Sequence, residues 1–285
     1  MLMKIQQNQK KMEINKIYNE NCIDTMARMP DGFVDLTVTS PPYDNLRTYN
    51  GYSFDFEAVA KELYRVTKQG GVVVWVVGDA TVKGSETGTS FRQALYFKEI
   101  GFNLHDTMIY EKINPIPQNH NRYEQCFEYM FVLSKGKPKT FNPITIQTKN
   151  SGKSFDWGNR KTLMDANQCR RDRPTDIIEV KNTKLKNNIF QYSIGGTKTG
   201  HPAVFPEQLA QDHIISWSNP GDIVFDPFSG SGTTAKMAYL TGRNYCGIDI
   251  SEEYCEIARR RVEQAQAQLR ITKITRNRQT HGEEE

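Results

Sequence analysis

The sequence predicts an α/β fold, with a mostly parallel sheet and helices on both faces. Three observations support this class. Short runs rich in β-branched residues alternate with segments whose apolar residues recur at helical spacing. The run VVVWVV at 72–77 is apolar throughout, which is typical of a parallel strand buried on both faces. Two turns of unusual composition each follow a predicted strand directly, where parallel sheets bind their ligands.

The elements are expected in the following order. Before residue 141 we predict strands at 33–39, 72–77, 104–111 and 126–134, and helices at 56–67 and 90–100. After residue 200 we predict helices at 206–217, 233–240 and 252–268, and strands at 223–225 and 245–250. Pro41 and Pro42 end the first strand, because proline cannot continue a ladder. The strands at 104–111 and 126–134 are expected to form an antiparallel pair at one edge of the sheet.

The middle of the chain differs from both ends. Residues 142–200 lose the periodicity and gain Lys, Asn, Thr and Gly, which predicts an inserted region of loops and short elements. We therefore expect one domain made of residues 14–141 and 201–270. Residues 1–13 and 271–285 are predicted to be flexible tails.

Charge is concentrated in the same middle segment. Eleven basic residues between Lys149 and Gly200 face five acidic ones, so their excess of six exceeds the net charge of +4 of the whole chain. Such a local excess indicates a nucleic acid as partner. No apolar run reaches membrane-spanning length and the N-terminus lacks a signal peptide, so a cytoplasmic protein is expected. The five cysteines form no CxxC pair, so neither a metal nor a disulfide framework is expected.

One of the two turns is glycine-rich and reads DPFSGSGTT at 226–234. Gly230 and Gly232 allow positive φ and a close approach of backbone to a ligand, and Thr233 can cap the following helix. Asp249 ends the next strand, where a carboxylate can accept hydrogen bonds from a ribose diol. A phosphate-binding P-loop would need a lysine that this turn lacks. A purely structural glycine turn is the other alternative.

The second turn is Ser40-Pro41-Pro42-Tyr43, directly after a predicted strand. An exocyclic amino group of a base is a poor nucleophile, and acceptors on its hydrogens free its lone pair. The Ser40 hydroxyl and the Pro41 carbonyl can supply two acceptors, which rigid prolines keep at a fixed separation. Tyr43 can stack on a base flipped out of a duplex. None of the cysteines follows a proline, which disfavours methylation of cytosine carbon 5 through a cysteine nucleophile. A simple Pro-Pro turn is the alternative reading.

Together the two turns resemble the S-adenosylmethionine-dependent amino-methyltransferases that act on DNA, whose fold is a Rossmann-like sheet. The resemblance covers about residues 16–264. It implies the catalytic residues Ser40, Pro41, Pro42 and Tyr43. It implies that the cofactor-binding residues are Asp24, Phe205, Pro206, Asp226, Phe228, Ser229, Gly230, Ser231, Gly232, Thr233, Thr234 and Asp249. For Asp24, a solvated surface acid is the alternative.

The order of the motifs, with the catalytic turn before the cofactor turn, is similar to that of the β group of this family. In that arrangement residues 142–200 are the target-recognition region, and the substrate is double-stranded DNA. The implied DNA-binding residues are Arg47, Tyr49, Lys153, Arg160, Lys161, Arg170, Arg171 and Arg173. For Arg47, a plain surface arginine is the alternative. A homodimer, a cognate restriction endonuclease and a bacterial or phage-type origin also fit the resemblance.

The target base is predicted from the first residue of the catalytic turn. Serine favours cytosine N4, because cytosine-N4 enzymes more often carry SPP[YF], whereas adenine-N6 enzymes more often carry Asp or Asn. Adenine N6 is the alternative. Two further classes stay open: an RNA or protein methyltransferase, which usually has the opposite motif order, and a non-catalytic DNA-binding protein that has kept the fold.

Overall fold

The computed structural model describes residues 12–42, 55–115, 121–156, 177–179, 181–193 and 206–281. The chain divides into two units: residues 143–187 form the smaller unit, and residues 1–142 with 188–285 form the larger unit. The two predicted functional turns begin at the ends of strands of the larger unit.

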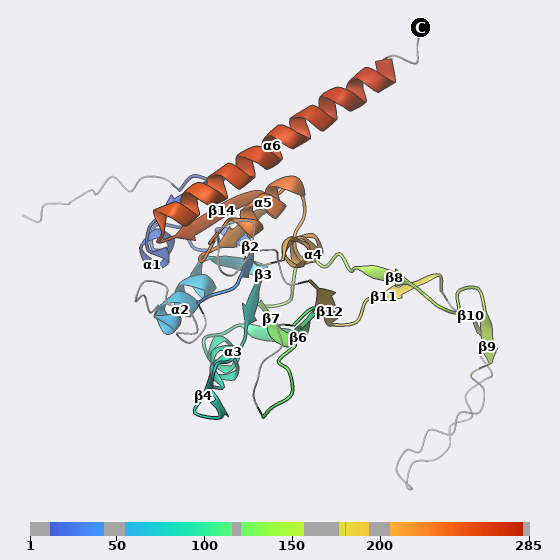
Figure 1. Cartoon of the computed structure of the whole chain (residues 1–285), viewed down its shortest axis with the longest axis horizontal. Coiled ribbons are helices and arrows are strands. Elements are labelled where there is room, and N and C mark those ends of the chain that lie inside the picture. The colour runs from blue at the N-terminus through green and yellow to red at the C-terminus, as the bar shows by residue number, and fades with distance from the viewer. Residues whose placement is uncertain are drawn as a thin grey trace, which may run out of the picture. The chain divides into compact units, whose positions relative to one another are not determined.

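The larger unit is built on an eight-stranded sheet in the order β1-β14-β13-β2-β3-β7-β6-β12 (Figure 1). β7 runs antiparallel to both of its neighbours, and every other neighbouring pair is parallel. The strands are Lys16–Asn19 (β1), Val34–Thr39 (β2), Thr67–Val77 (β3), Asn103–Lys112 (β6), Phe127–Ser134 (β7), Ile189–Tyr192 (β12), Ile223–Asp226 (β13) and Asn244–Asp249 (β14). The predicted mostly parallel α/β fold is confirmed.

Helices cover both faces of this sheet. They are Cys22–Met26 (α1), Phe56–Val66 (α2), Thr89–Glu99 (α3), Glu207–Trp217 (α4), Thr233–Leu240 (α5) and Glu252–His281 (α6). α1, α2 and α3 share one buried core with alternate residues of β3. α4, α5 and α6 contact β2, β13, β14 and β1 instead, so they lie on the opposite face. Within the described ranges, none of the helices combines the length and the apolarity needed to cross a membrane.

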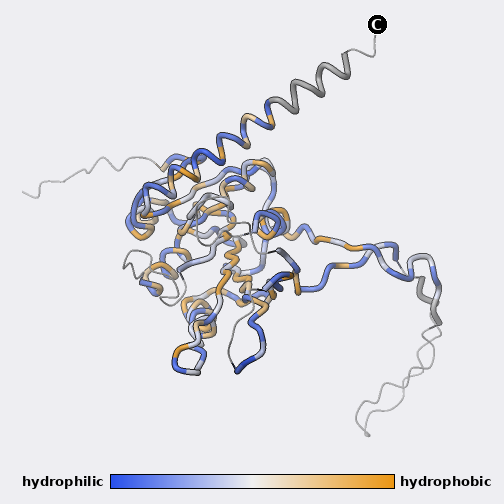
Figure 2. Tube along the Cα trace, in the orientation of Figure 1, coloured by the Kyte–Doolittle hydropathy of each residue, from blue (hydrophilic) through white to orange (hydrophobic). Residues whose placement is uncertain are grey.

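The centre of the sheet is β3, whose apolar run points side chains to both faces. Hydrophobic residues gather along the central strands of the larger unit (Figure 2). Trp75 is fully buried, its indole N–H donates to Gln93 Oε1 at 2.8 Å, and its ring meets Phe97 edge-on at 5.2 Å. A buried indole is stable only when its N–H has a partner, which α3 supplies here.

The expectation that β6 and β7 form the edge of the sheet is wrong. β6 and β7 do pair antiparallel, but β12 pairs with β6 on its other side and is the edge strand. β12 comes from residues that the sequence places in the inserted region. Exposed and buried residues alternate along β12, and Phe190 and Tyr192 are its buried residues. Four residues are too few for this alternation to be recognised in the sequence.

Three other elements differ from expectation. β1 and α1 are absent from the prediction, since each is five residues long or shorter. β3 begins at Thr67 rather than at 72, and its pairing with β2 shifts register between Thr67 and Val72, where Gly70 has a φ of +80°. α6 continues to His281, through residues predicted to be a tail, because neither Gly nor Pro occurs in it.

The smaller unit contains two short antiparallel pairs. Thr145–Gln147 (β8) pairs with Thr183–Leu185 (β11), and Ser154–Asp156 (β9) pairs with Ile177–Glu179 (β10). Every residue of β8 and β11 is exposed. In the larger unit, Thr81–Val82 (β4) and Ser85–Glu86 (β5) form a separate small hairpin.

Candidate active site

The two functional turns meet at neighbouring strand ends. β2 and β13 pair in parallel, with Phe225 opposite Thr37, so their carboxyl ends lie side by side. The hydroxyl of Thr39 donates to Asp226 Oδ1 at 2.6 Å. The hydroxyl of Thr234 donates to the carbonyl of Val38 at 3.1 Å. Both hydrogen bonds are buried and join segments 187 and 196 residues apart. The turn of Ser40 and the glycine-rich turn therefore border one site.

Asp226 is the buried anchor of this site. Its side chain also accepts the backbone N–H of Phe228 at 3.0 Å, and the residue is 6% exposed. Burial raises the pKa of its carboxyl group to about 6, against the opposing hydrogen bonds from Thr39, Phe228 and Thr234. The carboxyl group of Asp226 therefore keeps its proton to higher pH than a solvated aspartate does.

The glycine-rich turn requires Gly232 for two reasons. Gly232 has a φ of +76° and is the N-cap of α5. A Cβ at this position would lie 2.5 Å from the Cβ of Ala258 on α6. The predicted capping role of Thr233 is wrong, since Thr233 is already the first helical residue and its hydroxyl accepts a hydrogen bond from Arg261.

Asp249 fastens the turn to the end of β14. Its Oδ2 accepts the N–H of Gly230 at 2.8 Å, and its Oδ1 accepts the N–H of Ser251 at 2.9 Å. Asp249 is half-buried. Its carboxylate thus lies beside the turn, at the strand end where the sequence predicts a ribose-binding acid.

Two other residues of the turn pack inward. The hydroxyl of Ser229 is buried, has no hydrogen-bond partner among the described residues and lies against Gly247, where an added Cβ would stand 2.7 Å from it. Phe228 is half-buried, and its ring meets Trp75 at 6.3 Å. Among the parts of the chain that the structure describes, no group of three or more His, Cys, Asp or Glu could hold a metal ion.

Comparison with known proteins identifies the family. The family model described as DNA methylase, N6_N4_Mtase, matches residues 34–260. The chain belongs to this family. It is an S-adenosylmethionine-dependent amino-methyltransferase of DNA, with the motif order of the β group.

Individual relatives support the membership of this chain in the amino-methyltransferase family. The chain is 59% identical to the orphan methyltransferase M.BamHII of Bacillus amyloliquefaciens over 242 residues, which cover 81% of this chain and 89% of the relative. Two solved structures share the fold. The cytosine-N4-specific PvuII DNA methyltransferase has a TM-score of 0.64 at 20% identity and covers 88% of this chain and 87% of its own. The M1.HpyAVI–SAM complex has a TM-score of 0.57 at 24% identity, covering 87% and 98%.

Some of the residues predicted for this methyltransferase site lie within the described ranges, and others lie outside them. Ser40 and Pro42 are half-buried, Pro41 and Pro206 are buried, and Asp24 is exposed in the first turn of α1. Lys153 is exposed in the smaller unit. Several predicted residues lie outside the described ranges, namely Tyr43, Arg47, Tyr49, Arg160, Lys161, Arg170, Arg171, Arg173 and Phe205.

Sequence reasoning missed two residues that shape the methyltransferase site. Thr39 is fully buried and links the two turns, and its place directly before Ser40 was the available signal. Arg261 reaches the glycine-rich turn from α6, and its spacing from the turn along the chain gives no hint of this contact.

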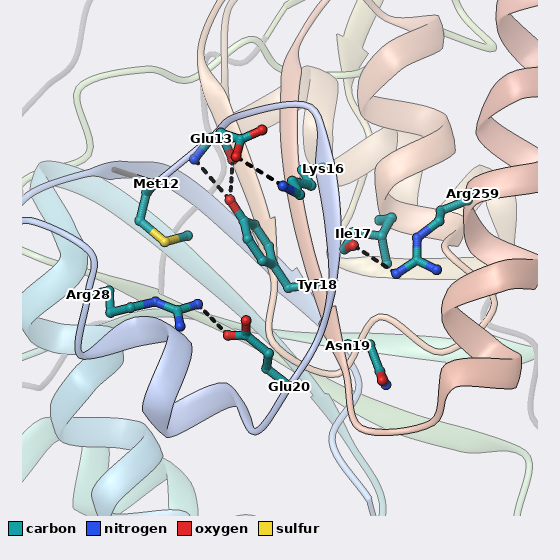
Figure 3. Close-up of a pocket in the computed structure, with 9 residues that line it drawn as sticks. All are labelled: Met12, Glu13, Lys16, Ile17, Tyr18, Asn19, Glu20, Arg28 and Arg259. Carbon is teal, nitrogen blue, oxygen red and sulfur yellow. Dashed lines mark hydrogen bonds and ion pairs between the residues drawn. The ribbon is translucent and has the colours of Figure 1, made fainter. Parts of the chain in front are cut away.

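A separate cavity of about 210 Å³ lies beside β1 (Figure 3). Lys16 pairs with Glu13 at 3.0 Å and Arg28 with Glu20 inside this cavity, whereas Arg259 pairs with Glu252 at 2.7 Å. The hydroxyl of Tyr18 donates to the carbonyl of Glu13 at 3.0 Å. None of the predicted methyltransferase-site residues that the structure describes lines this cavity.

Proposed function

We propose that this methyltransferase modifies the N4 amino group of cytosine in double-stranded DNA. The observation that carries the proposal is the placement of the Ser40 turn against the glycine-rich turn by the buried bond between Thr39 and Asp226. This placement brings acceptors for an amino group to the edge of the methyl-donor site. Serine rather than Asp or Asn at the first position favours cytosine over adenine.

Ser40, Pro41 and Tyr43 divide the work on the target base. The Ser40 hydroxyl and the Pro41 carbonyl accept hydrogen bonds from the two amino hydrogens, and this frees the nitrogen lone pair for attack on the methyl group. Pro41 is buried, which keeps these acceptors from moving away. Tyr43 stacks on the extruded base. S-adenosylmethionine, when bound, supplies a methyl group activated by its sulfonium charge.

The glycine-rich turn and its neighbours hold the cofactor. Asp226, Phe228, Gly230 and Gly232 border its methionine and sugar parts, and Ser229 contributes its place in the same turn. Asp249 accepts the ribose hydroxyls, since a carboxylate oxygen accepts more than one hydrogen bond. In this proposal Asp24 lies near the adenine, and Phe205 and Pro206 lie at the methionine end. The hydroxyls of Ser231 and Thr233 face Arg261 and support the turn instead.

DNA contacts are assigned to the smaller unit and to the loop after the catalytic turn. Lys153 and the arginines and lysine at 160–173 are proposed to neutralise phosphates, with Arg47 and Tyr49 beside the extruded nucleotide. A homodimer and a cognate restriction endonuclease stay predictions.

Nucleoside analysis tests the target base. The purified chain is incubated with duplex DNA and S-adenosylmethionine, and the digested DNA is examined by mass spectrometry. N4-methylcytosine is the expected product. Pure N6-methyladenine would contradict the cytosine assignment, and label transferred only to RNA or protein would contradict the DNA substrate. A chain that binds DNA but transfers no methyl group would be a binding protein.

The pKa of Asp226 predicts how stability depends on pH. The carboxyl group binds its proton more tightly in the folded than in the unfolded chain, since its pKa is raised to about 6 from 3.8. Its contribution to the free energy of unfolding is therefore present at pH 4 and is lost as pH rises through 6, by about 3 kcal/mol in total. In urea unfolding, Asp226→Asn should lack this loss. Asp212→Asn, at another buried carboxyl group, should keep it. Identical pH profiles for wild type and Asp226→Asn would contradict the assignment.

A further inference from the structure

Arg261 reaches from α6 to the second half of the glycine-rich turn. Its side chain is 12% exposed. Nη1 donates to the carbonyl of Ser231 at 2.6 Å, to the Ser231 hydroxyl at 2.8 Å and to the Thr233 hydroxyl at 3.1 Å. A guanidinium group carries five N–H donors in a rigid plane, so it can hold several acceptors in one arrangement.

The same guanidinium group also binds the beginning of α4. Nη2 donates to Glu207 Oε1 at 2.6 Å, and Lys236 Nζ donates to the same oxygen at 2.6 Å. Burial alone would raise the pKa of Glu207, but the hydrogen bonds from Lys236 and Arg261 outweigh it and lower the pKa. Glu207 therefore stays ionised at neutral pH. Because Glu207 directly follows Pro206, Arg261 joins the two segments proposed to bind the cofactor.

The two halves of the turn are held by different elements. The N–H groups of Ser229 and Gly230 donate to the carbonyl of Ile248 and to Asp249 Oδ2, both at 2.8 Å, so β14 fixes the first half. In the second half, the backbone carbonyl and the hydroxyl of Ser231 both accept from Arg261. The Gly232 N-cap has no side chain that could fix the start of α5. Arg261 therefore holds Ser231 and the Thr233 hydroxyl, next to the bonds of the Gly232 N–H to the Ser229 carbonyl at 2.8 Å and of the Thr234 hydroxyl to the Val38 carbonyl at 3.1 Å.

We propose that Arg261 is a positioning residue, which holds Ser231–Thr233 and Pro206–Glu207 in the arrangement that binds S-adenosylmethionine. The inference rests on the proposed role of the glycine-rich turn in cofactor binding. Arg261 lies behind the turn and takes no part in methyl transfer. Its loss should raise the Kd and KM for the cofactor and leave kcat at saturating cofactor nearly unchanged.

The test compares three variants on the same helix. Arg261→Met removes all four hydrogen bonds, and Arg261→Lys keeps the charge with a single ammonium group. Arg259→Met is the matched control, because Arg259 lies on the same helix, pairs with Glu252 of α6 at 2.7 Å and donates to the Ile17 carbonyl of β1 at 3.3 Å, without touching the turn. Arg261 also borders a cavity of about 420 Å³, so a methionine can be placed there without overpacking.

Two measurements decide the outcome. Calorimetric binding should show a Kd for S-adenosylmethionine raised about 10- to 100-fold in Arg261→Met, by a smaller factor in Arg261→Lys and not at all in Arg259→Met. Hydrogen exchange on the protein without cofactor should become faster at residues 229–236 in Arg261→Met, to a smaller extent in Arg261→Lys, and not in Arg259→Met. Wild-type binding is measured first, and its absence would refute the proposed cofactor site itself. If wild type binds, an unchanged Kd in Arg261→Met, or equal weakening in Arg259→Met, would overturn the positioning role.

Discussion

Ser40→Ala is expected to lower kcat about 100- to 1,000-fold while the Kd for S-adenosylmethionine stays close to the wild-type value. The substitution removes one of two proposed acceptors for the amino hydrogens. Loss of a single well-placed polar group that acts on the reacting centre has an effect of this size. Ser40 precedes buried Pro41, and the fold around it is kept by the Thr39 and Thr234 hydrogen bonds, which the substitution leaves intact.

A matched control for Ser40→Ala exists on β7. Ser134 is fully buried, and its hydroxyl has no hydrogen-bond partner within the described part of the chain. Ser134→Ala therefore removes a serine hydroxyl that has no proposed role, and it should leave kcat unchanged. Single-turnover kinetics at saturating cofactor measures the comparison. A fall of less than threefold in Ser40→Ala would refute the proposed role, and so would a fall that comes only from weaker cofactor binding.

Gly232→Ala is expected to lower the free energy of unfolding by about 2–5 kcal/mol. Two effects add. Left-handed backbone at a φ of +76° costs about 1–2 kcal/mol for a residue with a Cβ. The new Cβ, at 2.5 Å from the Cβ of fully buried Ala258, adds an overpacking cost of about 1–3 kcal/mol. Because relief of the clash requires α6 to move away from the turn, cofactor affinity should fall as well.

Gly84 separates the two effects. It has a φ of +81°, and a Cβ there would meet nothing within 4 Å. Gly84→Ala should therefore lose only the backbone part, about 1–2 kcal/mol. The pair Gly232→Ala with Ala258→Gly should recover only part of the overpacking cost, because the backbone Cα of residue 258 would still lie 2.8 Å from the new Cβ. Urea unfolding measures all variants. Equal losses at Gly232 and Gly84 would show that contact with Ala258 has no energetic weight.

Local patterns were sufficient to predict most of the elements. The β-branched run before Ser40 and the apolar run at 72–77 are strands, and the helical spacing at 56–67 forms α2. These patterns are reliable because burial selects apolar residues at the period of each element. β12 was not predicted, because its four residues are too few to show the alternation of a strand. The end of α6 was not predicted, because its polar composition is also typical of a tail.

The sequence by itself determined the composition of the two turns and their positions after strands. It determined neither which segments lie beside the turns nor which residues hold the turns in place. Hydrogen bonds between Thr39 and Asp226 and between Arg261 and Ser231 join residues 187 and 30 positions apart. Such contacts depend on which strands pair and on which helix face packs inward, and no local pattern encodes either. Only the tertiary structure could decide them, because β2 and β13 become neighbours when the whole sheet assembles.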